Sequence, residues 1–369
     1  MSEVFSFSTI YRAYMACRKN KRNTFNQLAF ESNLIENLWN LQGELSTYRY
    51  KIGRSLCFLT TSPKLREVFA ADFRDRVVHH VLVHELEPLF ERKFIHDVYN
   101  NRKEKGIHLA QKQAQRYMRQ TPNGFYLQLD IKGFFYHLDK EILFEKIKKE
   151  VIESTLDVSS ILYLSRKILF HDPTQDYVFK GDKRKLALLP EHKTLFKIPK
   201  RRGLPIGNLT SQFFANVYMN DFDNFVKRGL KVKRYIRYVD DFVLFSQSKE
   251  QLKAWKAEIQ RYLWEKLGLI LRSDTKLKPH SEGLDFLGYI IRPDYTLVRQ
   301  RVVNNYKYKK AKYLKEYEAQ RGKMGLAQIK QFLSVQASFV SHAKHANSYN
   351  LMNKVGNINE TDPFDYTRI

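Results

Sequence analysis

Apolar positions along the chain recur at helical spacing over several long stretches. Residues 8–50 show such a pattern, and a second one spans residues 68–89 and ends near Pro88. A polar, turn-rich connection with three prolines occupies residues 171–203. Further helices are expected over residues 138–168, 209–226 and 249–266, and from residue 302 to the end.

Other segments alternate with the period of a β-strand. In residues 125–130, Phe125, Leu127 and Leu129 fall on one face, and Asp130 ends the run on the other. Two β-rich arms, 235–239 and 242–245, flank the pair Asp240-Asp241, which predicts a hairpin with an acidic turn. A further strand is expected over residues 284–291. The chain therefore combines helices with short strands, and it shows no internal repeat.

Charge narrows the class of partner. The 369 residues contain 64 Lys and Arg against 39 Asp and Glu, a net charge of +25, and the basic residues recur along the whole chain. Release of counterions from phosphates would drive binding of such a chain to a polyanion. A basic protein that is merely soluble is the alternative. A hydrophobic content of 43% is enough for a packed core.

The two cysteines and the apolar runs bear on location. Cys17 and Cys57 are far apart and form neither a CxxC pair nor a disulfide framework, which suits a reducing cytoplasm. The N-terminal residues lack an apolar segment of signal-peptide length, and no run approaches the ~18 apolar residues of a membrane span. We therefore expect a cytoplasmic protein with no membrane partner.

Asp130 and the Asp240-Asp241 pair are the candidate catalytic groups. Transfer of a nucleotidyl group needs two divalent cations, and Mg²⁺ prefers a few carboxylates together with substrate phosphates. Taken alone, an aspartate pair is a common turn composition, and a strand-end Asp often caps a helix. His80 and His84 have zinc-like spacing, but no third ligand motif follows, so packing or surface histidines are favoured.

The motifs that surround these aspartates resemble those of reverse transcriptases, in the family's order. They are 66–67, 74–76 and 101–108 in the first third, Asp130–Phe135, Arg202–Gln212, Tyr238–Asp241 and Gly283–Gly288. The resemblance implies an α+β right-hand polymerase with an antiparallel palm sheet. Its expected divisions are an N-terminal helical extension (1–50), fingers (51–120), a palm (121–290, with 140–203 partly in the fingers) and a basic helical thumb (291–369).

The resemblance also implies residue roles. Two Mg²⁺ ions, replaceable by Mn²⁺, would bind Asp130, the Ile131 backbone, Asp240 and Asp241. Lys276 would be the general acid that protonates pyrophosphate, with Lys278 as its rival. The expected contacts to the incoming deoxynucleoside triphosphate are Ile131, Phe135, Arg74, Arg102, Ile206, Gly207 and Gln212.

Two of these roles have alternatives. Phe135 would place its ring against the 2′ position of the sugar, although Phe134 and Phe135 suit a core equally well. Only one of them can face the site if they lie in a strand, where neighbours point oppositely. Arg74 equally suits a surface helix, paired with Asp72 and Asp75.

Nine basic residues and four tyrosines interleave between Arg299 and Lys323. A charge run is usually a solvated helix face, but in a thumb it is expected to contact the RNA/cDNA hybrid, with phosphates neutralised and tyrosines stacked or packed. The residues expected to bind nucleic acid are Lys307, Lys309, Lys310, Lys312 and Tyr313.

One departure from the common pattern points to a subclass. Many relatives carry Gln before the central Gly and Pro after the Ser, where this chain has Ile206 and Gln212. This resembles reverse transcriptases of bacterial and phage diversity-generating retroelements. The resemblance implies a template-repeat RNA with its primer, cDNA made with errors at adenines (mutagenic retrohoming), and an accessory variability determinant protein. The alternatives are a group II intron or defence-type enzyme, or a catalytically idle RNA-binding protein.

Overall fold

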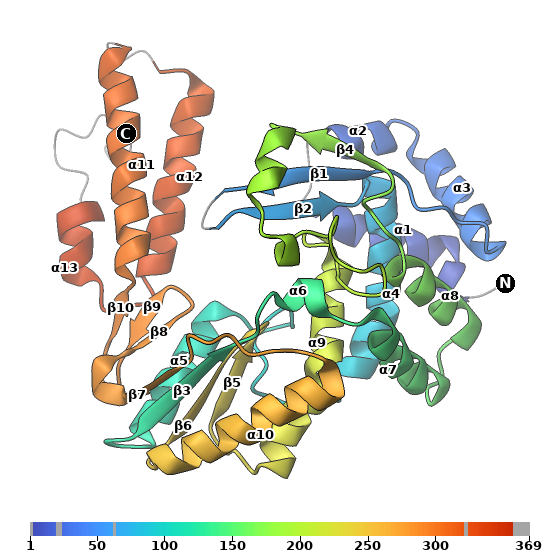
Figure 1. Ribbon diagram of the computed structural model, residues 1–369. Helices are drawn as coiled ribbons and strands as arrows, with labels where there is room; N and C mark the ends of the chain where they lie inside the picture. The colour runs from blue at the N-terminus through green and yellow to red at the C-terminus, as the bar shows by residue number, and fades with distance from the viewer. Residues whose placement is uncertain (1–2, 20–23, 62–63, 321–323, 357–369) are drawn as a thin grey trace. The chain divides into compact units, whose positions relative to one another are not determined.

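The computed structural model describes residues 3–19, 24–61, 64–320 and 324–356 (Figure 1). The chain divides into two compact units, each drawn from several stretches of sequence. The first unit comprises residues 1–104, 129–242 and 254–275, and the second comprises 105–128, 243–253 and 276–369. Helices and short, mainly antiparallel strands share the chain, so the expected α+β class is confirmed.

The first unit begins with helices. Residues 8–50, expected to be helical, form α1 (Phe7–Arg18), α2 (Phe25–Glu31) and α3 (Leu34–Ser46). Ser6 caps α1 by accepting the Thr9 N–H. Helix α1 packs along α4 (Phe73–Glu91), whose buried face carries valines and leucines.

The second expected helix was wrong at both ends. Residues Arg66–Ala70 form strand β2, and α4 begins only at Phe73, where Asp72 caps it by accepting the Arg74 N–H. The helix also continues past Pro88 to Glu91. The apolar spacing of 68–89 had merged a strand with the helix that follows it.

A three-stranded sheet that the sequence did not predict lies in the first unit. Strand β1 (Ser55–Thr60) pairs antiparallel with β2 and parallel with β4 (Tyr177–Lys180), giving the order β2-β1-β4. Cys57 faces Phe69 in this register. The polar connection 171–203 therefore contains a strand, together with two short 3-10 turns.

A four-stranded sheet carries both candidate acidic segments. Its order is β5-β6-β3-β7, with β3 at Phe125–Asp130, β5 at Tyr235–Tyr238, β6 at Asp241–Ser246 and β7 at Lys276–Pro279. The predicted strand 125–130 and the predicted hairpin around Asp240-Asp241 are both confirmed. The longer helices between residues 105 and 275 are α5 (Ile107–Arg119), α7 (Lys140–Ile152), α8 (Val158–Leu169), α9 (Leu209–Asn224) and α10 (Lys249–Leu267).

The second unit contains a small antiparallel sheet and a pair of helices. The single strand expected over 284–291 was wrong, because Leu287 (φ 52°) and Gly288 (φ 93°) turn the chain between β8 (Leu284–Phe286) and β9 (Tyr289–Ile291). Strand β10 (Thr296–Val298) follows, then α11 (Gln300–Ala319), α12 (Leu326–Ala343) and α13 (Tyr349–Leu351).

Helices α11 and α12 share an apolar seam. The rings of Tyr306 and Phe339 stack at 4.1 Å, and Tyr313 packs on the fully buried Phe332. The basic side chains of α11 therefore lie on its other faces. Among the described residues, no helix is long and apolar enough to cross a bilayer.

Candidate active site

Asp130 lies at the end of β3 and Asp240 lies in the β5–β6 turn. Both residues belong to the first unit. The Ile131 N–H donates to the Asp240 carbonyl oxygen across 3.3 Å, which ties the end of β3 to the turn. The Asp130 carboxylate is 40% exposed, and Asp240 and Asp241 are both partly exposed. The aspartates of both segments are therefore partly accessible to solvent.

The electrostatics indicate that Asp240 lies within range of the charge of Asp130. Burial, followed by the negative charge of Asp130, raises the pKa of Asp240 to about 6. Burial also raises the pKa of Asp130. Arg66 and Lys64 oppose the shift at Asp240. A like-charge pair of this kind is held together by the fold and is suited to bind a cation.

Arg272 is the cation nearest to Asp130 that the structure shows. Its backbone N–H donates to the Asp130 carbonyl oxygen at 2.9 Å, and its Nη1 lies 3.9 Å from the Asp130 carboxylate. Asp274 orients the guanidinium through two bonds of 2.8 Å. The side chain therefore offsets part of the repulsion between the two aspartates without closing a tight ion pair on Asp130.

Val239, which precedes the acidic pair, has an unusual backbone. Its φ is +60°, in the left-handed region that β-branched residues rarely enter. Such a conformation costs on the order of 1–3 kcal/mol and persists only where the surroundings enforce it. Strain is therefore stored in the turn that carries Asp240.

The donor set fits a hard divalent cation. Carboxylate and backbone carbonyl oxygens at Asp130, Ile131 and Asp240 are the ligand types that Mg²⁺ takes, usually with substrate phosphates completing its shell. In the described residues, no three or more His, Cys, Asp or Glu side chains converge as a metal cluster. The structure thus brings Asp130 and Asp240 together but does not add Asp241 to a converged triad, and it offers His80 and His84 no third ligand.

The loop Ile206–Gly207 lies against β2. The Phe69 N–H donates to the Ile206 carbonyl at 2.9 Å, and Asn208 Oδ1 accepts the Ala71 N–H at 3.0 Å. Gly207 has φ +120°, and a Cβ there would come within 2.6 Å of the Val68 side chain. Only glycine satisfies both the conformation and the close approach.

The side chains of this motif differ in exposure. Ile206 is partly exposed and Gln212 is exposed, whereas Ser211 is buried and donates to the Pro205 carbonyl at 2.6 Å. The backbone of the motif is thus fixed from within. The two side chains that depart from the common pattern remain accessible to a ligand.

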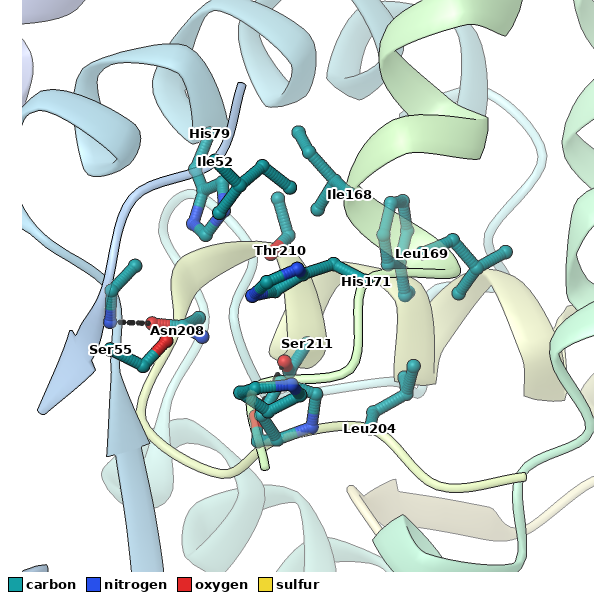
Figure 2. A pocket seen from close by; sticks show the side chains of 14 residues that line it. Ile52, Ser55, His79, Ile168, Leu169, His171, Leu204, Asn208, Thr210 and Ser211 are labelled. Carbon is teal, nitrogen blue, oxygen red and sulfur yellow. Dashed lines mark hydrogen bonds between the residues drawn. The ribbon is translucent and has the colours of Figure 1, made fainter. Parts of the chain in front are cut away.

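A small cavity lies beside this loop (Figure 2). It has a volume of about 20 Å³, room for roughly one water molecule, so it cannot hold a nucleotide. The polar side chains around it are those of Ser55, His79, His171, Asn208, Thr210 and Ser211. This cavity is therefore not the substrate site.

The two phenylalanines after Asp130 differ in burial. The alternation expected of a strand was wrong, because both lie in the short helix α6 (Phe134–His137), which follows Gly133 at φ +56°. Phe134 is 2% exposed and belongs to the core, whereas Phe135 is partly exposed. The Phe135 carbonyl accepts the Leu204 N–H at 2.8 Å. Phe135 is thus the ring available to a ligand.

Arg102 serves the fold and not the predicted triphosphate contact. Its side chain is 7% exposed, its guanidinium binds the Glu91 carboxylate at 2.7–3.0 Å, and Nη1 donates to the Ile95 and Val98 carbonyls. These bonds use its donors internally. With these bonds in place, the buried guanidinium is not presented to a triphosphate.

The Arg74 side chain is also bound to other groups of the fold. It forms an ion pair with Glu44, donates to the Lys51 carbonyl at 3.2 Å and lies 3.8 Å from Asp75. Of the two roles open from the sequence, the structure shows the ion-paired one. The positive charges of Lys64 and Arg66 lower the pKa of Asp240. Neither residue was among the predicted triphosphate contacts, because the antiparallel pair β1–β2 was not predicted.

The second unit holds the remaining candidates. Lys276 is an exposed residue at the start of β7, and Lys278 pairs with Glu282. Tyr313 is 9% exposed and packs on Phe332, so packing replaces its predicted nucleic-acid contact. Along α11, Lys307, Lys309 and Lys312 are exposed and Lys310 is partly exposed.

The segments that build this site also match a known protein family. Residues 61–291 match the family of reverse transcriptases, described as RNA-dependent DNA polymerases. Protein YkfC of Escherichia coli (strain K12) is 25% identical, over 78% of this chain and 80% of that protein.

Among solved structures, telomerases of two yeasts resemble the chain. That of Candida albicans, in complex with a TWJ fragment of telomeric RNA, is 12% identical with a TM-score of 0.46, over 89% of this chain and 61% of that one. That of Candida tropicalis is 14% identical with a TM-score of 0.46, over 86% and 58%. The chain thus spans less than two thirds of the telomerase chains it matches.

The family match covers more than half of the chain. It includes the end of β3, the β5–β6 turn and the glycine loop between them. The chain therefore belongs to the family of reverse transcriptases, described as RNA-dependent DNA polymerases.

Proposed function

We propose that this enzyme copies RNA into cDNA by two-metal nucleotidyl transfer, with Asp130, the Ile131 carbonyl, Asp240 and Asp241 as metal ligands. The observation that carries the proposal is the hydrogen bond from the Ile131 N–H to the Asp240 carbonyl oxygen, which holds the end of β3 beside the β5–β6 turn. Burial, followed by the negative charge of Asp130, raises the pKa of Asp240 to about 6. Two Mg²⁺ or Mn²⁺ ions would stabilise the attacking and leaving oxygens of the transfer. The carboxylates hold negative charge where those ions are needed.

Basic side chains of the first unit would bind the triphosphate. Lys64 and Arg66 both act on Asp240, so a phosphate chain near Asp240 would lie within their field. In this proposal they take the place of Arg74 and Arg102. Lys276 remains the proposed general acid, and its side chain is exposed to solvent.

Two positions would read the nucleotide. Phe135 offers a partly exposed ring close in sequence to Asp130, and a bulky ring at the sugar would exclude a 2′-hydroxyl. Ile206, Gly207 and Gln212 would contact the nascent base pair, from a loop whose backbone β2 fixes. The exposed lysines of α11 would neutralise phosphates of the RNA/cDNA hybrid.

The subclass we propose is that of a diversity-generating retroelement. Ile206 and Gln212 support it, because both depart from the common motif and both are accessible. The template would be a template-repeat RNA with its primer, and the cDNA would carry errors at adenines. The accessory variability determinant protein would be the partner, in the cytoplasm of a bacterial or phage-infected cell.

Replacing either coupled aspartate tests the catalytic assignment. Asp130→Asn and Asp240→Asn should each reduce DNA synthesis by about 10²-fold or more, because Asn lacks the charge that binds the cations. Primer extension on an RNA template with Mg²⁺ measures the loss, and filter binding checks that RNA is still bound. Asp176→Asn, an exposed aspartate paired with Arg54, is the matched control and should stay active. Near wild-type synthesis by either variant would remove that residue from the site.

The raised pKa of Asp240 predicts a pH-dependent stability difference without any substrate. Its folded pKa of about 6 exceeds the ordinary aspartate value of 3.8, so the stability this group contributes is present below pH 4 and lost as the pH rises through 6. Asp240→Asn should therefore match wild type at about pH 4 and exceed it by about 1–2 kcal/mol at pH 7.5, after allowing for solvent screening.

Urea unfolding of both proteins in EDTA, at several values between pH 4 and 7.5, measures this difference. Added Mg²⁺ should raise the stability of wild type and narrow the gap, since a bound cation removes the repulsion. A difference that does not change with pH would mean that Asp240 does not titrate in this range.

Sugar selection is tested at Phe135. Phe135→Ala should raise incorporation of ribonucleotides relative to deoxynucleotides by roughly 10-fold, because the space taken by the ring opens to a 2′-hydroxyl. Competition between matched nucleotides in primer extension gives the ratio. Phe134→Ala is the contrasting variant, expected to destabilise the core without changing sugar choice. Unchanged discrimination by folded Phe135→Ala would assign the role elsewhere.

Fidelity is tested at Ile206. A Gln there could reward correct geometry with a hydrogen bond worth about 0.5–1.5 kcal/mol, whereas Ile offers only shape and dispersion. Ile206→Gln should therefore lower misincorporation opposite template adenine several-fold, and more than errors at other bases. Ile206→Leu, which keeps the position apolar, is the control. Sequencing cDNA from one template decides it, and equal adenine error rates would locate the infidelity at Gln212 or in the partner.

A further inference from the structure

Both backbone groups of Val239 are held by buried side chains. Its N–H donates to Asn100 Oδ1 at 2.9 Å, and its carbonyl accepts from Arg237 Nη1 at 2.9 Å. Val239 is the residue in the left-handed region, immediately before Asp240. The two peptide units that flank this strained residue are therefore each fixed by one hydrogen bond.

Arg237 is itself fixed by a buried ion pair. Its side chain is fully buried, and it binds Asp223 of α9 through Nε at 2.8 and 3.0 Å and through Nη2 at 2.6 Å. The Tyr235 hydroxyl donates to the same carboxylate at 2.7 Å. Asp223 thus occupies the Nε–Nη2 edge of the guanidinium, and Nη1 on the other side donates to the Val239 carbonyl.

Asn216, also on α9, joins the two halves. Its Oδ1 accepts from Asn100 Nδ2 at 2.9 Å and from Arg237 Nη1 at 3.2 Å, and its Nδ2 donates to the Asn100 carbonyl at 2.9 Å. Asn100 and Asn216 are 3% and 1% exposed. Water cannot replace these partners, so loss of one leaves buried polar groups unsatisfied.

The backbone completes the connection. The Arg237 N–H donates to the Asp97 carbonyl and the Tyr99 N–H donates to the Arg237 carbonyl, both at 3.0 Å. The segment from Asp97 to Asn100 thus runs along β5 and delivers the Asn100 side chain to the turn. All of these residues belong to the first unit.

We propose that Asn100, Asn216 and Arg237 form a hairpin clamp, a set of positioning residues that holds Val239 left-handed so that the Asp240 carboxylate faces Asp130. The clamp touches neither substrate nor metal. It acts through the backbone of Val239, whose preference for an ordinary conformation would otherwise turn Asp240 away. This inference rests on the proposed catalytic role of Asp240.

The strain at Val239 allows a test that distinguishes the hairpin clamp from a network that only stabilises the fold. A buried network that only stabilised the fold would be needed whatever residue stood at 239. A clamp that opposes strain becomes dispensable once the strain is removed, and glycine adopts φ near +60° freely. The Val239→Gly background therefore tests what the clamp is for.

The experiment is a double-mutant cycle of Asn100→Ala and Val239→Gly in the full chain. Asn100→Ala should lower kcat for primer extension by about 10–100-fold, as expected for a misplaced catalytic group, and change KM for the nucleotide by less than about 3-fold. In the Val239→Gly background, the same change should cost less than about 3-fold in kcat. Thermal unfolding, run in parallel, establishes that each variant is folded at the assay temperature.

Asn37→Ala is the matched control. It removes one partly buried amide bond, from Asn37 Nδ2 to the Phe30 carbonyl at 2.8 Å, far from the hairpin in sequence. It should lower the melting temperature and leave kcat unchanged. An unchanged kcat in folded Asn100→Ala, or an equal loss of kcat in both backgrounds, would overturn the clamp.

Asp240→Asn, assayed alongside, separates this inference from the proposed function. If Asp240→Asn still synthesises DNA, the catalytic assignment fails. If Asp240→Asn is inactive while Asn100→Ala keeps its full kcat, the clamp alone is overturned.

Discussion

Repulsion between Asp130 and Asp240 is the constraint on which the site depends. Burial, followed by the negative charge of Asp130, raises the pKa of Asp240, and burial raises the pKa of Asp130. Two such carboxylates stay close only because the fold holds them. Three features of the first unit offset the repulsion. The Ile131 N–H ties β3 to the turn, Arg272 lies 3.9 Å from one carboxylate, and Lys64 and Arg66 act on the other. Each supplies order or positive charge where the pair would otherwise separate.

That constraint also divides the arginines into two kinds. Arg102 and Arg237 are buried and bound to carboxylates of the fold, at Glu91 and Asp223, although Arg237 also interacts with the charge of Asp240. Arg66 lowers the pKa of Asp240, and the charge of Arg272 interacts with those of Asp130 and Asp240. Sequence position does not distinguish these kinds, because Arg66 and Arg102 both lie in segments that resemble the fingers motifs. Only the tertiary partner of each guanidinium decides which role it has.

Local patterns predicted those parts of the site that local sequence determines. Alternation placed β3 with Asp130 at its end, and β-rich arms around two aspartates predicted the hairpin. Strand β2 was misread because its apolar residues also fit the spacing of the helix that follows. The turn at Leu287 was missed because a positive φ at leucine is imposed by its surroundings. Tyr313 was misassigned because packing between α11 and α12 cannot be read from one helix.

Backbone positions in this site are fixed by neighbours remote in sequence, and that leaves side chains free to differ. The Phe69 N–H donates to the Ile206 carbonyl and the Val68 side chain leaves room only for glycine at position 207, so backbone contacts with β2 fix the course of the loop. Asn100 and Arg237 hold the peptide units that flank Val239 in the same manner. A polymerase built this way can change the chemistry presented to the nascent pair without moving the carboxylates. Geometry and selectivity then rest on separate residues, and each can vary while the other is kept.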